Sequence, residues 1–180
     1  GKVVVGGDSV NTSALGPYYV SYSAKDALGN EATTVTRLVE VKDLTGPVIS
    51  LVGASTITVE CGGVYTEPGA SAIDTVDGDV SSNLVIDDSA VPNPATLGTY
   101  IVTYDATDNS GNAATRVTRT VTVVDTTKPT LTVIGFGTVQ VECHSAYTDA
   151  GATATDTCDG AVTVTSNALS AVDTNNAVSY

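Results

Sequence analysis

The sequence is poor in the residues that helical and catalytic proteins use. It has no methionine or tryptophan, one phenylalanine and one histidine, and its main apolar residues are valine and alanine. Threonine and serine are its main uncharged polar residues. β-Branched residues favour strands over helices, and no stretch repeats its apolar residues at the helical spacing. We therefore expect an all-β protein.

Basic residues are also scarce, with seven lysines and arginines against 20 aspartates and glutamates and a net charge of −13. Such a chain would repel a nucleic-acid backbone or an anionic membrane, and no apolar run approaches the ~20 residues of a membrane helix. We expect neither a nucleic-acid partner nor membrane insertion of this segment. The acidity has two explanations, cation binding and the solubility of a secreted surface.

Catalytic residue types are nearly absent. The single histidine, His144, lies beside a turn, and no serine or cysteine stands in a nucleophile motif. The neighbouring carboxylates Asp87 and Asp88 would point to opposite faces of a strand instead of forming an acid/base pair. We expect that the protein is not an enzyme.

What the sequence does contain is an internal repeat, because distinctive residues return 82 positions later. Cys61 returns as Cys143, and Asp43 returns as Asp125. Ten more residues obey the same offset: Gly16, Tyr18, Tyr22, Asp26, Arg37, Tyr65, Gly69, Asp74, Asp77 and Gly78 return as Gly98, Tyr100, Tyr104, Asp108, Arg119, Tyr147, Gly151, Asp156, Asp159 and Gly160. Copying at one period predicts tandem domains of one design.

Two proline-bearing joints, residues 43–47 (DLTGP) and 125–129 (DTTKP), separate the copies. They divide the chain into the C-terminal half of one repeat (1–45), a complete repeat (46–126) and the N-terminal half of another (127–180). Within the complete repeat, apolar and polar residues alternate in about seven short strands separated by turn residues, which predicts an antiparallel two-sheet sandwich.

Half a sandwich exposes apolar faces and open strand edges, so the two half-repeats need an explanation. The sequence is a window from a longer chain, which we favour, or the front half of one copy completes the back half of the next by strand addition. Both explanations predict neighbouring copies or repeats of the protein itself as partners, joined head to tail. A contact of this kind that does not close into a ring builds a fibre.

Two acidic loops could hold a hard cation. Residues 74–79 (DTVDGD) and 105–112 (DATDNSGN) place carboxylate and amide oxygens on tight turns, which suits calcium. The candidate ligands are Asp74, Asp77, Asp79, Asp105, Asp108 and Asn112. The competing explanation is that Asp, Asn and Gly are ordinary turn residues, whose side chains cap their own backbone.

The segments VECGGVYTEPGASAIDTVDGDV and GTYIVTYDATDNSGNAATRVTRTVTVVD resemble the bacterial surface immunoglobulin-like repeat family, which is related in style to hyalin-type and cadherin-like repeats. The likeness extends over all three segments. It implies tandem immunoglobulin-like antiparallel β-sandwich repeats in a secreted, extracellular or cell-surface protein. Because cadherin-like proteins take calcium ligands from the joints between domains, it also implies Asp43 and Asp125 as ligands.

The resemblance implies a disulfide as well. Related repeats often carry a paired half-cystine at the positions of Cys143, expected on a strand, and Cys158, in the acidic loop that follows. Cys61 is then left unpaired, either as a small core residue or as one half of an intermolecular bridge. Separately, Asn11 begins an Asn-Thr-Ser glycosylation acceptor sequence.

Members of the resembled family serve as stalks, adhesin arms and spacers. The expected function is therefore that of a structural or adhesive extracellular repeat protein in a cell-surface stalk or filament. The alternative is a spacer or glycan-binding accessory module of a secreted hydrolase, with surface glycans as ligands. A glycan-binding face would expose aromatic side chains, whereas the tyrosines alternate into the expected core, with Tyr19 the main exception.

Overall fold

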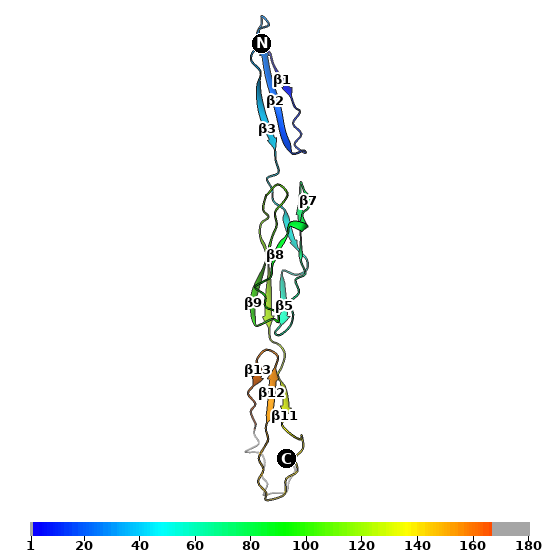
Figure 1. Ribbon diagram of the computed structural model, residues 1–180, viewed down its shortest axis with the longest axis vertical. Coiled ribbons are helices and arrows are strands. Elements are labelled where there is room, and N and C mark those ends of the chain that lie inside the picture. The colour runs from blue at the N-terminus through cyan, green and yellow to red at the C-terminus, as the bar shows by residue number, and fades with distance from the viewer. Residues whose placement is uncertain (1, 167–180) are drawn as a thin grey trace. The chain divides into compact units, whose positions relative to one another are not determined.

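The protein is described by a computed structural model that covers residues 2–166 (Figure 1). Over these residues the regular elements are strands and one short 3-10 helix, so the all-β fold class is confirmed. The elements are β1 (Lys2–Gly7), β2 (Gly16–Lys25), β3 (Val35–Val41), β4 (Val48–Leu51), β5 (Thr56–Glu60), β6 (Ala70–Asp74), β7 (Gly78–Asp79), η1 (Ser81–Asn83), β8 (Val85–Asp87), β9 (Gly98–Asp105), β10 (Val117–Val124), β11 (Thr130–Val133), β12 (Ala152–Asp156) and β13 (Gly160–Val162).

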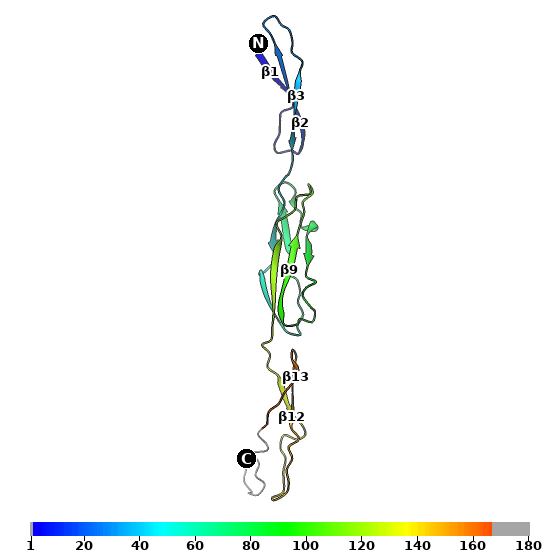
Figure 2. The ribbon, with the colours of Figure 1, turned by 90° about the vertical axis from the view of Figure 1, so that its left-hand side faces the viewer.

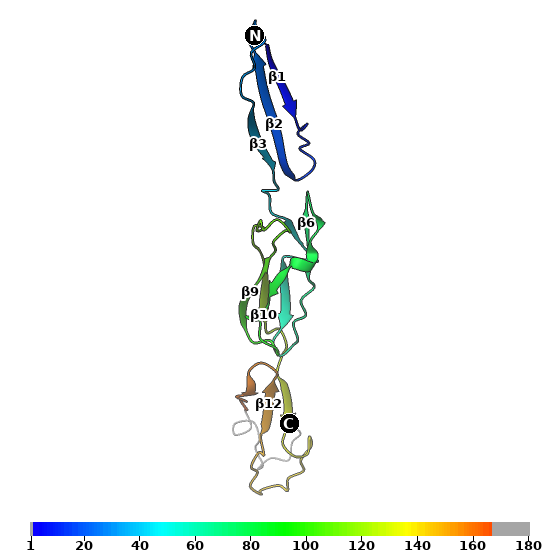
Figure 3. The ribbon, with the colours of Figure 1, turned by 45° about the horizontal axis from the view of Figure 1, so that its top comes forward.

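These strands form four sheets, in the orders β1-β2-β3, β4-β6-β7, β5-β10-β9-β8 and β11-β12-β13. Figure 2 shows β12 beside β13 in the last sheet, and Figure 3 shows β9 beside β10 in the largest. The expectation of purely antiparallel sheets is wrong at one place, because β5 pairs in parallel with β10, with Ile57 opposite Val121. Sequence alternation sets which face a residue occupies but not the direction of its partner strand, so it could not reveal this pair.

The 82-residue offset of the sequence returns in the bounds of the strands. β4 and β11 begin and end at equivalent residues, as do β6 and β12, and β2 and β3 begin where β9 and β10 begin one offset later. The isolated bridge between Lys25 and Glu31 recurs between Thr107 and Ala113. The repeat is therefore structural at these elements, although residues 138–142, the counterparts of β5, form no strand.

The strongest alternation of buried and exposed residues lies in β9 and β10. Val102 and Tyr104 of β9 and Val121 of β10 are fully buried, as their period-two spacing predicts. Each fully buried side chain of this size contributes roughly 1.5–3 kcal/mol of transfer free energy. The central pair of strands thus carries the apolar core of the complete repeat.

The chain divides into two compact units. The first comprises the chain up to Val52, Ala70–Val85 and Tyr104–Val117, and the second comprises Gly53–Gly69, Ile86–Thr103 and the chain from Thr118 onwards. Each proline-bearing joint therefore lies inside one unit, together with the loops of the complete repeat that surround it. The expected repeat bounds, 1–45, 46–126 and 127–180, stay a prediction.

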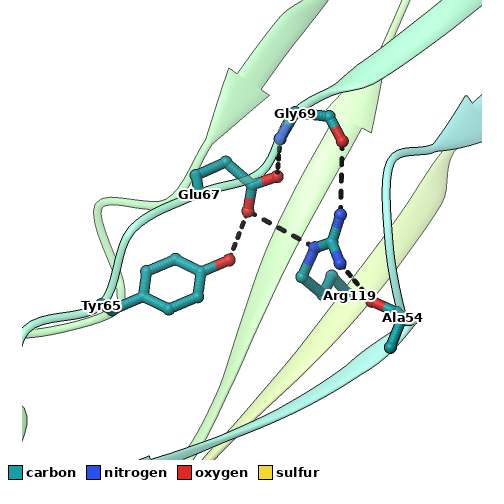
Figure 4. Close-up of polar contacts among 5 residues, drawn as sticks. All are labelled: Ala54, Tyr65, Glu67, Gly69 and Arg119. Carbon is teal, nitrogen blue, oxygen red and sulfur yellow. Dashed lines mark hydrogen bonds and ion pairs between the residues drawn. The ribbon is translucent and has the colours of Figure 1, made fainter.

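One charged side chain is built into the interior of the second unit. Arg119 of β10 is fully buried, and its Nε lies 3.4 Å from Glu67 Oε2 (Figure 4). The guanidinium also donates to the carbonyl oxygens of Ala54 and, at 3.3 Å, Gly69. Glu67 in turn accepts hydrogen bonds from the Tyr65 hydroxyl and, at 2.7 Å, from the Gly69 amide. A buried ion pair is tolerated when hydrogen bonds satisfy its remaining polar atoms, which is the case here.

Candidate functional site

Four aspartates converge where the first joint meets two loops of the complete repeat. Asp43 comes from the joint, Asp74 is the last residue of β6, Asp77 lies in the turn between β6 and β7, and Asp108 comes from the loop after β9. One carboxylate oxygen of each lies within 4.8 Å of those of the other three. Asp43, Asp74 and Asp108 are buried and Asp77 is half-buried. All four were expected as ligands, so the structure brings together half of the eight residues in that set.

Two of the carboxylates, those of Asp74 and Asp108, are held in place by hydrogen bonds from their own turns. Asp74 Oδ1 accepts the backbone amides of Val76 and Asp77, at 2.7 and 3.0 Å. Asp108 accepts the backbone amide and the side-chain amide of Asn112, at 2.7 and 2.8 Å. The turn-capping explanation is therefore correct for these two residues. It does not exclude cation binding, because a carboxylate has about four lone-pair sites.

Hydrogen bonds also connect the three chain segments. The Asn112 side chain donates to the Asp43 carbonyl oxygen at 3.2 Å, and the Asn109 amide donates to Asp77 Oδ2 at 2.9 Å. These two bonds tie the loop after β9 to the joint on one side and to the β6–β7 turn on the other. The cluster is thus built from parts of the chain that only tertiary structure assembles.

The electrostatics of the cluster are unbalanced. None of the ion pairs found within residues 2–166 involves any of the four aspartates. Asp43 Oδ2 is buried and accepts no hydrogen bond from the described part of the chain. Desolvation acts to raise the pKa of Asp108, but the hydrogen bonds from Asn112, Ser110 and Gly111 outweigh it and the pKa lies below its ordinary value. Asp108 is therefore ionised at neutral pH.

Three of the other expected ligands, Asp79, Asp105 and Asp125, lie outside this cluster, and Asn112 borders it. Asp79 is exposed and accepts the Ser81 amide at 2.9 Å. Asp105 forms a bidentate ion pair with Arg116, at 2.9 and 2.8 Å. Asn112 contributes its amide protons as a positioning residue, and Asp125 lies at the second joint. Sequence spacing could not separate these roles, because residues two positions apart in a loop can face different neighbours.

The second joint repeats part of the arrangement. Asp125, Asp156 and Asp159 are the counterparts of Asp43, Asp74 and Asp77, and Asp156 Oδ1 accepts the amides of Cys158 and Asp159 at 2.7 and 3.2 Å. Asp156 Oδ2 is buried and accepts no hydrogen bond from the described residues. Desolvation and the negative charges of Asp156, Glu60 and Asp159 raise the pKa of Asp125.

Glu60, to which no sequence motif pointed, fastens the second joint to the end of β5. Its carboxylate accepts the backbone amides and the hydroxyls of Thr126 and Thr127, at 2.8 to 3.0 Å. These bonds, led by the Thr126 amide, lower the pKa of Glu60. The two adjacent threonines of the joint were a weak signal, since a threonine hydroxyl can donate a hydrogen bond to a nearby carboxylate.

The expected disulfide between Cys143 and Cys158 is wrong. Cys158 is bonded to Cys61, the residue expected to be unpaired, across 97 positions with the two Cα atoms 5.6 Å apart. The Cys143 thiol is exposed and outside this bridge, and the residue lies in a turn instead of the expected strand. Cys61 is buried against Ala95 and Val123, but as a bridged cysteine and not as the unpaired core residue that was expected. The bond joins the second repeat to the third.

The pairing is decided by which segments meet in the structure. The complete repeat has no bridge between the positions equivalent to Cys143 and Cys158, because Val76 stands where Cys158 stands one offset later. Two cysteines bridge only when their Cα atoms come within about 7 Å. The acidic loop of one repeat instead meets the end of β5 in the preceding repeat, which is where Cys61 lies.

Gly46 shows how closely the first joint packs on the complete repeat. A Cβ atom at this position would lie against the Ala113 carbonyl oxygen and 2.6 Å from its carbonyl carbon. Both neighbours are backbone and cannot swing aside. Gly46→Ala is therefore expected to lower the free energy of unfolding by about 1–3 kcal/mol, the usual cost of overpacking, measured by urea denaturation. Gly137→Ala is the control, because no atom lies within 4 Å of its Cβ, and equal losses in the two variants would contradict the prediction.

Asn11 is exposed, and its side-chain oxygen accepts the Ser13 amide at 3.0 Å. Its glycosylation stays a prediction. In the described residues, no helix has both the length and the apolar character needed to span a membrane.

Repeated strand patterns joined at proline-bearing segments define a tandem immunoglobulin-like repeat protein. Residues 1–41 and 49–123 match the family described as bacterial surface protein, Ig-like domain, and the chain belongs to this family. The resemblance found in the sequence motifs is thereby confirmed.

Several known proteins are similar to the chain. An 81.3 kDa protein of Acholeplasma phage L2 is 37% identical over 58% of the chain. Hyalin of Lytechinus variegatus is 36% identical over 66% of it, and the pesticidal crystal protein Cry22Aa of Bacillus thuringiensis is 30% identical over 63%. The chain spans only 14%, 23% and 15% of these relatives. The crystal structure of a lipoprotein of Bacteroides thetaiotaomicron is similar, with 25% sequence identity and a TM-score of 0.37. The match covers 59% of this chain and 53% of the lipoprotein chain.

Proposed function

We propose that the protein is a non-catalytic, structural and adhesive repeat segment of an extracellular stalk or filament at a cell surface, with calcium as the cation of its first joint. The membership of a bacterial surface family and the hyalin relatives support a surface role. The disulfide supports an oxidising, extracellular setting, because cytosolic thiols are kept reduced.

The observation that carries the proposal is the covalent bond between consecutive repeats. The bridge joins Cys61, at the end of β5, to Cys158, in the turn between β12 and β13. A pulling force applied to the two ends of the chain would pass from Cys61 directly to Cys158. Residues 62–157, which include most of the complete repeat, would then carry no load. This load path suits a segment whose task is to hold its length under tension.

Neighbouring copies or repeats of the protein are the partners in this proposal, joined head to tail. The two sides of the Arg119 network recur separately at the 82-residue offset. Arg37 in β3 is the counterpart of Arg119, and Tyr147 and Asp149 are the counterparts of Tyr65 and Glu67. The Tyr147 hydroxyl donates to Asp149 at 3.2 Å, as Tyr65 does to Glu67. Desolvation and the negative charge of Asp149 raise the pKa of this tyrosine. Arg37 on one copy and the Asp149 carboxylate on another are complementary in charge, which favours assembly in one register.

The load path can be tested by stretching single molecules of the 180-residue chain through handles at its two ends. The two bridged cysteines are separated by 97 positions in the sequence, so reduction with dithiothreitol is expected to lengthen the fully extended chain by about 320–350 Å at ~3.3–3.6 Å per residue. Cys143→Ser is the matched control and should keep the difference between oxidised and reduced molecules. Equal extension of the two would show the load passing through the whole second repeat and would overturn the proposal.

A further inference from the structure

We propose that Asp43, Asp74, Asp77 and Asp108 form a calcium site that fastens the first joint to the two acidic loops of the complete repeat. Only the biological role of this site rests on the proposed function, because a rigid joint would help a stalk to keep its shape. The four carboxylates define the site, and calcium binding to it can be measured independently of any mechanical role.

The first argument is the charge of the cluster. Four carboxylate oxygens within 4.8 Å of one another, on residues of which three are buried, repel each other strongly. Buried charges are tolerated when they are paired or when they coordinate a metal. No ion pair within the described residues 2–166 neutralises any of the four. A divalent cation at their centre supplies the missing positive charge.

A second, independent observation is a buried oxygen of Asp43 that accepts no hydrogen bond from the described residues. Asp43 is more than nine-tenths buried, and its Oδ1 already accepts the amide and the hydroxyl of Thr45, at 3.1 and 3.0 Å. Its Oδ2 is buried and accepts no hydrogen bond from the described chain. A buried acceptor without a partner costs about 1–3 kcal/mol, and more when it is charged. Metal coordination would satisfy this oxygen, which is the only Asp43 oxygen left for a ligand.

The ligand chemistry selects calcium. The cluster contains carboxylates and neither histidine nor cysteine, which excludes the preferred ligands of zinc and copper. Calcium takes six to eight oxygens in flexible geometry, from carboxylates that bind through one or both oxygens and from waters. Magnesium demands a near-ideal octahedron, which turns already fixed by their own hydrogen bonds are poorly suited to provide. Half-buried Asp77 leaves the cluster open to water.

The four ligands come from three separate chain segments, so calcium binding should hold these segments together. Asp43 precedes β4, Asp74 and Asp77 flank the β6–β7 turn, and Asp108 follows β9. No single loop can bind the ion alone, so binding is coupled to the correct placement of all three segments. At the second joint, Asp125, Asp156 and Asp159 do not form such a cluster within the described residues, and the Cys61–Cys158 bond fastens that joint instead. The two joints are thus held by different means, a cation and a disulfide.

Calcium binding can be measured on the 180-residue chain by calorimetric titration, with thermal melting in EDTA and in millimolar CaCl2. We expect one ion per chain and a higher melting temperature with calcium, because a ligand that binds only the folded state stabilises it. Asp43→Asn and Asp108→Asn keep the side-chain size and one oxygen while removing a negative charge. Each should weaken calcium binding by about tenfold or more. Asp79→Asn, in the same acidic loop but outside the cluster, is the matched control and should bind calcium as the unmodified chain does.

A second readout separates a binding site from a merely structural role. In EDTA, Asp43→Asn relieves the repulsion among the four carboxylates, so its melting temperature should equal or exceed that of the unmodified chain. In calcium the order should reverse. A melting temperature that falls in both buffers would show that Asp43 acts only through local packing and would overturn the site.

Two other results would also overturn the proposal: no heat and no melting shift at millimolar calcium, or an equal response to magnesium. The stretching experiment depends on the disulfide and needs no calcium. Failure of the calcium site would therefore leave the load path unaffected, and failure of the load path would leave the binding data intact.

Discussion

Replacing Arg119 with methionine is expected to lower the free energy of unfolding by about 3–5 kcal/mol, the usual loss when one partner of a buried ion pair is removed. The side chain is fully buried, and the Glu67 side chain is only 11% exposed. Without Arg119, the Glu67 carboxylate would keep the hydrogen bonds from Tyr65 and Gly69 but lose its counter-charge. The carbonyl oxygens of Ala54 and Gly69 would lose a donor as well. Urea denaturation at neutral pH measures the effect.

Two further variants show whether burial is the cause. Arg116→Met removes an exposed ion pair with Asp105, whose side chains are 62% and 40% exposed, and should cost about 1 kcal/mol or less. The double variant Arg119→Met/Glu67→Gln should recover part of the loss, because no unpaired charge remains. An Arg119→Met loss no larger than that of Arg116→Met would contradict the account of the buried network.

Removing the Cys61–Cys158 bridge is expected to lower the free energy of unfolding by about 4 kcal/mol. The bond closes a loop of 97 residues, and closing a loop of roughly 100 residues is worth about 4.7 kcal/mol in the chain-entropy model, of which proteins often realise less. Cys158→Ser is the preferred variant, because Cys61 also packs in the core against Ala95 and Val123. Urea denaturation without reductant measures the change.

Cys143→Ser serves as the control for this second prediction, since the exposed Cys143 thiol lies outside the bridge. Its effect should be within about 0.5 kcal/mol, as for other surface substitutions. A peptide map made without reduction should contain the fragments of Cys61 and Cys158 linked to each other. Linkage of Cys143 to Cys158, or equal losses in the two serine variants, would refute the pairing.

The strand pattern of the protein was largely predictable. Alternation at Tyr100, Val102 and Tyr104 identified β9, and the offset of 82 identified its counterpart β2. Both signals are local, because successive residues of a strand point to opposite faces of the sheet, so the face follows from position along the strand alone. The parallel pairing of β5 with β10 had no such signal. It depends on which strand lies alongside β5, and only the assembled sheet decides that.

The acidic site was predictable in its residue types but not in its membership. The motif DTVDGD contains Asp74 and Asp77, which join the cluster, and Asp79, which faces Ser81 instead. Similarly, Asp108 joins it while Asp105 pairs with Arg116. Turn residues are selected by local backbone needs, so the same aspartates look alike in sequence whether they cap a turn, pair with an arginine or meet other carboxylates.

By itself the sequence determined the all-β class, the tandem repeat and the family, because strand alternation and copying at a fixed period are written along the chain. Tertiary structure alone decided the partner of Cys158 and the grouping of Asp43 with Asp74, Asp77 and Asp108. Both depend on distances between residues remote in sequence, and those distances are set by the way consecutive repeats meet. The sequence pattern shows which residues recur from one copy to the next, whereas the contacts at the joints are between residues of two different copies.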